Sequence, residues 1–325
     1  MLDTDRKVDF VVAGTQKGGT SALRSYLKGH PEICISDPDA VIAYLRSHPG
    51  IGYAEPQEGH FFDTEVHFGG RDVDYSIYHS YFRPRSTHRI FGEVTPIYMY
   101  WSPAMQRIYE YNPNMKIIII LRNPIERAYS HWNMERDRGY DTVSFWHAIT
   151  EEKTRCCNAL PYQHRIFSYV DRGFYVEQLK RMWNYFPRSQ TLILRNEDLM
   201  KAPHIVLKKV CSFLHVSEYE KIEKKVVHAR PYKSFLRYKE WKYLKNIFES
   251  EITELENLTG WNCREWLDYE HYKKSVGCNH KTSSLPIKEL LSENLKSCVS
   301  VMFRKSMWQD SKTRGNNIKN MIEKK

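Results

Sequence analysis

Long apolar runs are missing from these 325 residues, and so is any regular cysteine spacing. The apolar run at residues 117–121 is far too short to span a bilayer, which takes about 20 residues. The seven cysteines are an odd number without framework spacing, which excludes a disulfide-stapled scaffold and favours reduced thiols. We see no signal peptide ahead of the first predicted strand, so we expect a cytoplasmic protein without a membrane span.

Metal-binding and nucleic-acid-binding motifs are also missing. None of the 14 histidines forms a His-x₃-His set, and no Cys-x₂-Cys pair occurs, so we expect no metal. The net charge of +10 is compatible with a polyanionic ligand. However, residues 278–325 hold ten Lys or Arg against four Asp or Glu, which accounts for about +6 of that charge. The rest of the chain is only mildly basic, and we expect no nucleic-acid partner.

The pattern of apolar residues alternates between strands and helices over most of the chain, which predicts a parallel sheet. The predicted fold is therefore α/β, a single P-loop-like domain with a central parallel sheet flanked by helices. Strands are predicted at residues 8–13, 33–35, 90–92, 116–121 and 190–195. Helices are predicted at residues 20–29, 103–111, 124–136, 142–151, 172–186, 203–214, 217–225 and 238–258.

The domain boundaries follow from breaks in this rhythm. One domain is predicted over residues 1–268, and the proline-containing stretch 37–56 reads as an insertion or surface loop with a short helix at 39–47. Periodicity weakens after residue 268, where Lys, Ser and Asn become frequent. Residues 269–325 are therefore predicted to form a basic extension, either partly disordered or with a peripheral helix around 286–306.

The segment from Val8 to Ser21 predicts an anion-binding loop. An apolar strand leads into a glycine-rich loop with one lysine, and a helix then begins at a hydroxyl residue. Glycines let backbone N–H groups approach an anion, and the helix N-terminus and Lys17 add positive charge. In the Walker A pattern the lysine follows the last glycine, whereas here Lys17 precedes the pair Gly18-Gly19. We therefore expect a phosphorylated cofactor other than a nucleoside triphosphate.

A second anion site is predicted after the strand at 116–121. Arg122 follows this strand at the carboxyl edge of the sheet, where ligands bind in open α/β folds. Ser130 lies two helical turns further on. An arginine fork with a hydroxyl suits a phosphate group.

Together these two segments resemble the sulfotransferases that use 3′-phosphoadenosine 5′-phosphosulfate (PAPS) as donor. The resemblance covers roughly residues 8–268. Besides the two anion segments it includes Glu58-Gly59-His60-Phe61-Phe62-Asp63, Gly92-Glu93-Val94-Thr95-Pro96, Arg172-Gly173-Phe174-Tyr175, Glu197-Asp198-Leu199 and the stretch Trp261 to Leu267.

The resemblance implies a donor site. Lys17 to Ser21 would hold the 5′-phosphosulfate, and Arg122 and Ser130 the 3′-phosphate. Gln16 and Tyr175 are assigned to the same site. The desulfated product would be 3′-phosphoadenosine 5′-phosphate (PAP). The full set of expected donor-binding residues is Gln16, Lys17, Gly18, Gly19, Thr20, Ser21, Arg122, Ser130, Tyr175 and Arg230.

The resemblance also implies the catalytic groups. Lys17 would stabilise the bridging oxygen of the leaving phosphate, and a base must take the proton of the acceptor. Glu58 corresponds to the base of the family's carbohydrate branch, whereas His60 would be the base if the chain followed the small-molecule branch. The chain departs from the carbohydrate branch at Val94, where that branch commonly has lysine, and it lacks a clear nucleotide-covering loop. Arg230 is the candidate for that covering role.

These features predict an enzyme that sulfates a hydroxyl or amine of a small natural product or metabolite by in-line displacement. The stretch from Gln163-His164-Arg165 to Tyr175 looks like soluble bacterial members of the family. A carbohydrate O- or N-sulfotransferase is one alternative. A kinase-like P-loop protein or a nucleotide-binding module is another. The expected partner is the small-molecule acceptor, and the expected state is a monomer or a homodimer.

Overall fold

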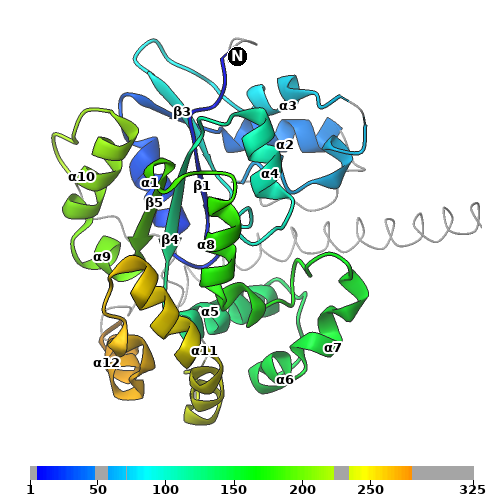
Figure 1. Cartoon of the computed structure of the whole chain (residues 1–325), viewed down its shortest axis with the longest axis vertical. Coiled ribbons are helices and arrows are strands. Elements are labelled where there is room, and N and C mark those ends of the chain that lie inside the picture. The colour runs from blue at the N-terminus through cyan, green and yellow to red at the C-terminus, as the bar shows by residue number, and fades with distance from the viewer. Residues whose placement is uncertain (1–5, 48–57, 71, 223–233, 280–325) are drawn as a thin grey trace, which may run out of the picture.

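Five parallel strands form the centre of the molecule (Figure 1). The computed structural model describes residues 6–47, 58–70, 72–222 and 234–279. The strand order in the sheet is β2-β3-β1-β4-β5. The strands are β1 (Phe10–Gly14), β2 (Ile33–Ile35), β3 (Ile90–Val94), β4 (Lys116–Leu121) and β5 (Thr191–Arg195).

The central position of β1 and β4 follows from their sequences. All five residues of β1 and the last five of β4 are buried, as expected for strands covered on both faces. Val11 pairs with Ile117 on one side of β1 and with Glu93 on the other, all in parallel register. The predicted α/β fold with a central parallel sheet is therefore confirmed, and each predicted strand agrees with an observed one to within two residues.

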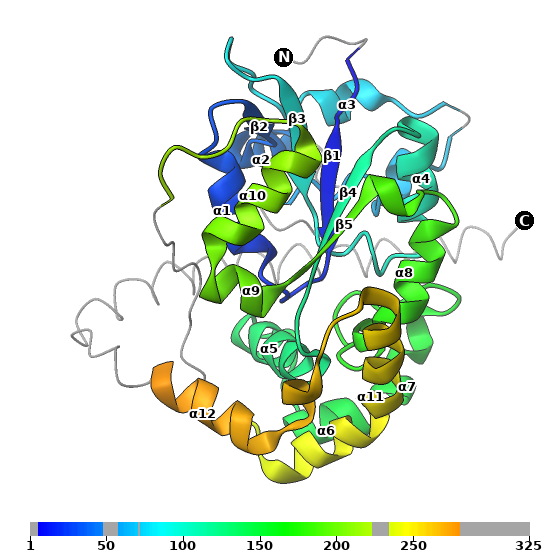
Figure 2. The ribbon, with the colours of Figure 1, turned by 60° about the vertical axis from the view of Figure 1, so that its left-hand side comes forward.

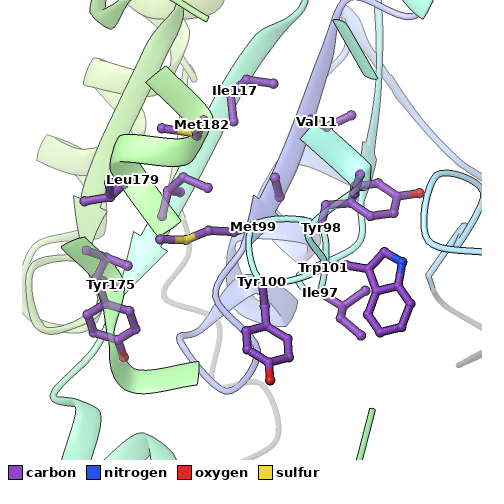
Figure 3. Close-up of a cluster of buried hydrophobic side chains, with 14 of the residues drawn as sticks. Val11, Ile97, Tyr98, Met99, Tyr100, Trp101, Ile117, Tyr175, Leu179 and Met182 are labelled. Atoms are coloured by element: carbon purple, nitrogen blue, oxygen red, sulfur yellow. The ribbon is translucent and has the colours of Figure 1, made fainter. Parts of the chain in front are cut away.

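Helices cover both faces of the sheet (Figure 2). Phe10 and Val12 of β1 face a cluster with the helices α1, α9 and α10, whereas Val11 and Ala13 face a second cluster with α4, α5, α8 and α11 (Figure 3). This alternation is the two-residue period of a strand. The first group of helices is α1 (Thr20–Lys28), α9 (Asn196–Lys201) and α10 (Pro203–Leu214), and the second is α4 (Ala104–Tyr111), α5 (Pro124–Asp137), α8 (Tyr175–Trp183) and α11 (Tyr238–Thr259).

The remaining helices lie around this core. The helices α5, α6, α7, α11 and α12 gather below the carboxyl ends of the strands (Figures 1 and 2). The helices outside the two groups that cover the sheet are α2 (Pro38–Ser47), α3 (Tyr75–His79), α6 (Phe145–Thr150), α7 (Glu152–Cys156) and α12 (Tyr269–Asn279). Short 3₁₀ turns occur at Glu65–His67, Cys157–Ala159, Asp171–Gly173, Arg188–Gln190 and Arg264–Leu267.

The predicted helix at 217–225 is wrong over its described part, which has no helical residues up to residue 222. Side chains fix this segment against other elements instead. The backbone N–H and the hydroxyl of Ser217 donate to Glu32, and the Tyr219 hydroxyl donates to the carbonyl oxygen of Tyr26, 3.0 Å away. These long-range bonds override the local preference for helix.

Two further helix predictions are corrected in detail. The predicted helix 142–151 begins at Phe145, because Ser144 caps it, and α7 follows directly after it. The predicted helix 172–186 spans only Tyr175–Trp183, since residues 171–173 form a 3₁₀ turn. The short helix expected at 39–47 is confirmed as α2.

The ends of the predicted domain stay predictions. The helix α12 lies beyond residue 268, and the hydroxyl of its Tyr272 accepts a hydrogen bond from the Leu236 N–H at 3.0 Å. Residues 48–57 of the expected insertion and the expected helix at 286–306 lie outside the described residues. Across the described part of the chain, no helix combines the length and apolar character needed to cross a membrane.

Candidate functional site

The glycine-rich loop between β1 and α1 lies at the carboxyl edge of the sheet and touches β4. The Thr15 N–H donates to the Ile120 carbonyl oxygen at 2.9 Å, and the Gly18 N–H donates to the Thr15 carbonyl oxygen at 2.8 Å. A Cβ on Gly18 would lie 2.4 Å from the Ile120 oxygen, and one on Gly19 would lie 2.2 Å from Nδ2 of Asn196. Gly19 also has a φ of 106°. Both positions therefore require glycine.

The start of α1 presents backbone N–H groups at this loop. Thr20 is buried and Ser21 is exposed, and first-turn amides lack acceptors within the helix. Lys17 directs its ammonium group toward α5, where Nζ lies 3.6 Å from the sulfur of Met134. The carboxamide oxygen of Gln16 accepts a hydrogen bond from Arg172. This combination of amides, helix N-terminus and lysine can hold an anion.

The second predicted anion site lies on the next strand–helix junction. Arg122 directly follows β4, and its Nη2 donates to Oε2 of Glu126 at 2.7 Å. Ser130 is buried on α5. Tyr175 is fully buried, and its hydroxyl donates to the carbonyl oxygen of Arg122 at 2.8 Å. Tyr175 thus fixes the backbone beside Arg122.

The Arg122 junction is built by local sequence. The side chain of Asn123 accepts the Ile125 N–H at 3.0 Å and so caps α5, and Pro124 occupies the first turn. Because β1 and β4 are neighbours in the sheet, the glycine-rich loop and this junction lie at the same edge.

The candidate base segment follows the undescribed stretch 48–57 and packs against the end of β3. The Gly59 N–H donates to Oγ1 of Thr95 at 3.0 Å, and the Phe61 N–H donates to the Tyr98 hydroxyl at 3.0 Å. A Cβ on Gly59 would lie 2.0 Å from Oε2 of Glu93, so glycine alone fits there. These contacts hold Glu58 and His60 on either side of Gly59 at the sheet edge.

Three side chains of this segment form a line of charge. Nε2 of His60 lies 3.1 Å from Oε2 of Glu58, and Nδ1 donates to Oδ2 of Asp63 at 2.9 Å. The Glu58 side chain is 21% exposed, whereas that of Asp63 is fully buried. Nη1 of Arg165 donates to the same Oδ2 of Asp63 at 2.5 Å.

The charges around His60 determine its protonation. Burial alone would lower the pKa of His60, but the carboxylates of Asp63 and Glu58 outweigh burial and raise this pKa to about 10. Burial would raise the pKa of Asp63, but His60 and Arg165 hold it below its usual range. An imidazolium has no free lone pair, so His60 donates to Asp63 through Nδ1 and forms an ion pair with Glu58 on its Nε2 side.

Asp63→Asn should lower the His60 pKa toward the ordinary value of 6.5 and reduce stability at neutral pH. A group whose pKa is raised on folding stabilises the folded state fully at pH values below its pKa in the unfolded chain. We therefore expect the ion pair's contribution to unfolding free energy to be complete below about pH 6.5 and to fade toward about pH 10. NMR titration of the His60 ring and unfolding at about pH 6 and about pH 9.5 measure both effects.

Asp72→Asn serves as the control for this experiment, because it makes the same substitution at an exposed aspartate. A His60 ring that titrates near its ordinary value in the unmodified protein would contradict the proposed charge line.

Sequence reasoning missed the roles of two arginines that connect the site. Arg172 is buried, donates to the Gln16 carboxamide, and donates through Nη2 to the carbonyl oxygen of Arg165 at 2.6 Å. The side chain of Arg165 in turn holds Asp63. Arg172 thus links the glycine-rich loop to the base segment. Its place in the Arg-Gly-Phe-Tyr motif was a signal, but nothing local to Arg165 indicated a role.

A third missed residue is Arg24, which is buried on α1. Its Nη2 donates to the Ser36 carbonyl oxygen at 2.6 Å. Burial lowers the pKa of Arg24, and the carboxylates of Glu58 and Glu93 partly offset this. Arg24 on α1 therefore brings a positive charge that acts on Glu58. Val94 is uncharged and is packed into the core cluster that contains Phe10 and Leu23. The signal was an arginine among the apolar positions of a short helix.

Glu93 is the second carboxyl behind the base segment. It is fully buried, and burial raises its pKa to about 7. It faces Gly59 closely, which restricts the backbone between Glu58 and His60. Glu93 therefore acts as part of the wall that shapes this segment.

Two expectations cannot be placed in the same way. Arg230, the candidate for covering the nucleotide, lies outside the described residues. In the ranges that the structure describes, no three His, Cys, Asp or Glu side chains gather as metal ligands. The absence of a metal stays a prediction.

Comparisons with known proteins agree with these features. The family model described as the sulfotransferase domain matches residues 7–257. Heparan sulfate glucosamine 3-O-sulfotransferase 3A1 of Mus musculus is 27% identical over 212 residues, which is 63% of this chain and 44% of that protein. The bifunctional heparan sulfate N-deacetylase/N-sulfotransferase 3 of Mus musculus is 29% identical over 220 residues, which is 66% of this chain and 23% of that protein.

These alignments span less than half of the length of the two curated relatives. Among solved structures, a sulfotransferase from Alicyclobacillus acidocaldarius superimposes with a TM-score of 0.62 at 24% identity. The superposition covers 81% of this chain and all of that one, and it establishes the shared fold.

Proposed function

Because this chain belongs to the sulfotransferase family, we propose that it transfers a sulfuryl group from PAPS to a hydroxyl or amine of an acceptor. One observation carries the proposal: a glycine-rich anion loop and the Glu58–His60–Asp63 line meet at one edge of the sheet and are linked through Arg172. A binding module would not need a carboxylate held by a buried imidazolium beside its anion loop.

The residues present fit the donor. Gly18 and Gly19 let the loop pack tightly against the protein just before α1, where Lys17, Thr20 and Ser21 are proposed to bind the 5′-phosphosulfate. Arg122 and Ser130 on the neighbouring junction are proposed to hold the 3′-phosphate. When bound, the donor supplies the sulfuryl group and an anionic leaving group.

Glu58 is proposed as the base that takes the acceptor proton on its carboxylate. His60 is unsuited to this role because its raised pKa keeps it protonated at neutral pH. It is instead proposed to orient Glu58 through their ion pair at 3.1 Å. A placed carboxylate base typically contributes on the order of 10²–10⁴ in rate. Lys17 is proposed to offset the negative charge that develops on the leaving oxygen.

We propose a carbohydrate as the acceptor. The names of the curated relatives place their activity on heparan sulfate, which supports this alternative over the small natural product expected from the sequence. The cytoplasmic location and the monomeric or homodimeric state stay predictions.

The proposal is tested by incubating the full chain with PAPS and oligosaccharide acceptors. We expect PAP to be released and one sulfo group to be added to the acceptor, as seen by mass spectrometry. A parallel thermal-shift titration with PAP and ATP tests the kinase-like alternative, because a ligand that binds the folded state raises the melting temperature, and more so the further its concentration exceeds its Kd. Stabilisation by ATP but not by PAP would refute the proposal.

Arg122→Ala should weaken PAP binding by roughly 10- to 150-fold, because a charge-assisted hydrogen bond is typically worth about 1.5–3 kcal/mol. The turnover at saturating donor should change much less, since the 3′-phosphate is remote from the transferred group. Isothermal titration with PAP measures the first effect and initial rates measure the second. Arg85→Ala, on an exposed loop, is the matched control. Unchanged PAP affinity in both Arg122→Ala and Ser130→Ala would remove these residues from the site.

A further inference from the structure

A pocket of about 370 Å³ opens beside the base segment, on the loop before residue 167. Its wall includes Trp101, Asn158, Tyr162, His164 and Arg165. Small-molecule sites commonly enclose roughly 300–1,000 Å³ and combine aromatic rings with a few polar groups. This pocket has that size and that composition, and the proposed chemistry leaves it unused.

Two aromatic rings form one side of the pocket. The rings of Trp101 and Tyr162 are nearly parallel, at 14°, with centroids 6.2 Å apart. Tyr162 is 53% exposed, whereas Trp101 is buried on the loop that also carries Tyr98 and Tyr100 (Figure 3). The guanidinium of Arg165 lies 4.3 Å from the Trp101 ring centroid. Tyr162 therefore offers an accessible ring that lies parallel to a buried one.

Apart from Arg165, the polar side chains that line the pocket are neutral. Nδ1 of His164 accepts the N–H groups of Ile166 and Phe167 at 3.1 and 3.0 Å. Its proton therefore resides on Nε2, which makes His164 a neutral donor. Burial lowers the pKa of His164, and the nearby charges of Arg172 and Arg155 lower it further.

The charge of the pocket is already compensated. Among the described residues that line it, Arg165 is the single Lys or Arg, and its guanidinium is bound to the Asp63 carboxylate and carbonyl. A sulfate or carboxylate entering the pocket would have to compete with Asp63 for this cation. An uncharged ligand meets no such cost.

The pocket lies close to the proposed reaction site. Arg165 contacts Asp63, Asp63 contacts His60, and His60 contacts Glu58, so three successive side-chain contacts connect the pocket wall to the base. The backbone of Arg165 is also tied through Arg172 to the glycine-rich loop. An acceptor of two or three linked rings could fill the pocket with one ring and present another to Glu58.

We propose that this pocket binds an uncharged, hydroxyl-bearing sugar ring of the acceptor. The C–H face of such a ring packs against the electron-rich face of Tyr162, and its hydroxyls pair with His164 and Asn158. The inference rests on the proposed function and narrows its acceptor to a neutral oligosaccharide. It sets this chain apart from the two curated relatives, whose names refer to heparan sulfate.

The test measures binding of defined probes to the full chain saturated with PAP. The neutral probes are cellotriose, maltotriose and chitotriose, and the anionic probe is a heparosan tetrasaccharide. We expect at least one neutral probe to bind, with an affinity that changes little with salt because no charge is neutralised. Tyr162→Ala and His164→Ala should each weaken that probe by about tenfold. Tyr162→Phe keeps the ring and should bind nearly as the unmodified protein does.

Tyr109→Ala removes another partly exposed aromatic ring, on α4, and is the matched control. Binding of the tetrasaccharide alone, failure of all three neutral probes, or equal binding by Tyr162→Ala would overturn the inference. PAP affinity is measured in the same proteins, so that failure of the pocket can be told from failure of the proposed function. If the unmodified protein does not bind PAP, the proposed function is refuted. If it binds PAP and any of those three outcomes occurs, only the pocket proposal is refuted.

Discussion

Glu58→Gln should retain PAP binding and lose most sulfuryl transfer, on the order of 10²–10⁴ in rate. Glutamine preserves the size of the side chain but cannot accept the acceptor proton. The loss should appear in the chemical step, because Glu58 is held by His60 and not by the residues proposed for the donor. Single-turnover rates with PAPS already bound isolate that step from donor binding.

The matched control is Glu254→Gln, which removes an exposed carboxylate on α11 that pairs with Lys180. His60→Asn should slow the chemical step less than Glu58→Gln, since it removes the cation that orients Glu58 and leaves the carboxylate in place. If His60→Asn were inactive while Glu58→Gln kept near-normal single-turnover rates, His60 would be the base and the raised His60 pKa would not describe the working enzyme.

Lys17→Ala should reduce the single-turnover rate by roughly 10²-fold or more while the fold is retained. The side chain lies in the glycine-rich loop outside both hydrophobic clusters, so its removal should disturb little packing. Its positive charge is proposed to act where negative charge develops during transfer. Initial rates and circular dichroism together distinguish lost chemistry from lost folding.

Lys28→Ala is the control, because Lys28 is exposed in the last turn of α1, the helix that follows the loop. If Lys17→Arg restored much of the rate, the requirement would be for charge alone. Near-normal turnover in Lys17→Ala would remove Lys17 from the mechanism.

The fold was largely accessible from the sequence because its signals are local. The isoleucine run of β4 predicts a doubly buried strand, and the strand–glycine–helix pattern predicts the loop before α1. The same reasoning gave a helix at 217–225, where bonds to Glu32 and Tyr26 impose a non-helical path. Local patterns fail where contacts distant in the chain determine the backbone.

The candidate site was accessible only in part. The motifs identify Lys17, Arg122 and Ser130 as anion-binding candidates, and the neighbouring strands β1 and β4 bring their segments to one edge. The donor contact expected of Tyr175 stays a prediction, and its hydroxyl also donates to the Arg122 carbonyl oxygen. From the sequence alone, a side chain that contacts a ligand cannot be told from one that supports a ligand-binding residue.

Most strands and helices, the two candidate anion-binding segments and the resemblance to sulfotransferases could be predicted from the amino-acid sequence, because each depends on residues close together in the chain. The links between the base segment and the glycine-rich loop became visible only in the folded chain. Arg165 reaches Asp63 across 102 positions and Arg172 reaches Gln16 across 156. The carboxylates of Asp63 and Glu58 raise the His60 pKa against the effect of burial, which makes Glu58 the proposed base. Protonation follows from distances between charges and from solvent exclusion, which only the folded chain establishes.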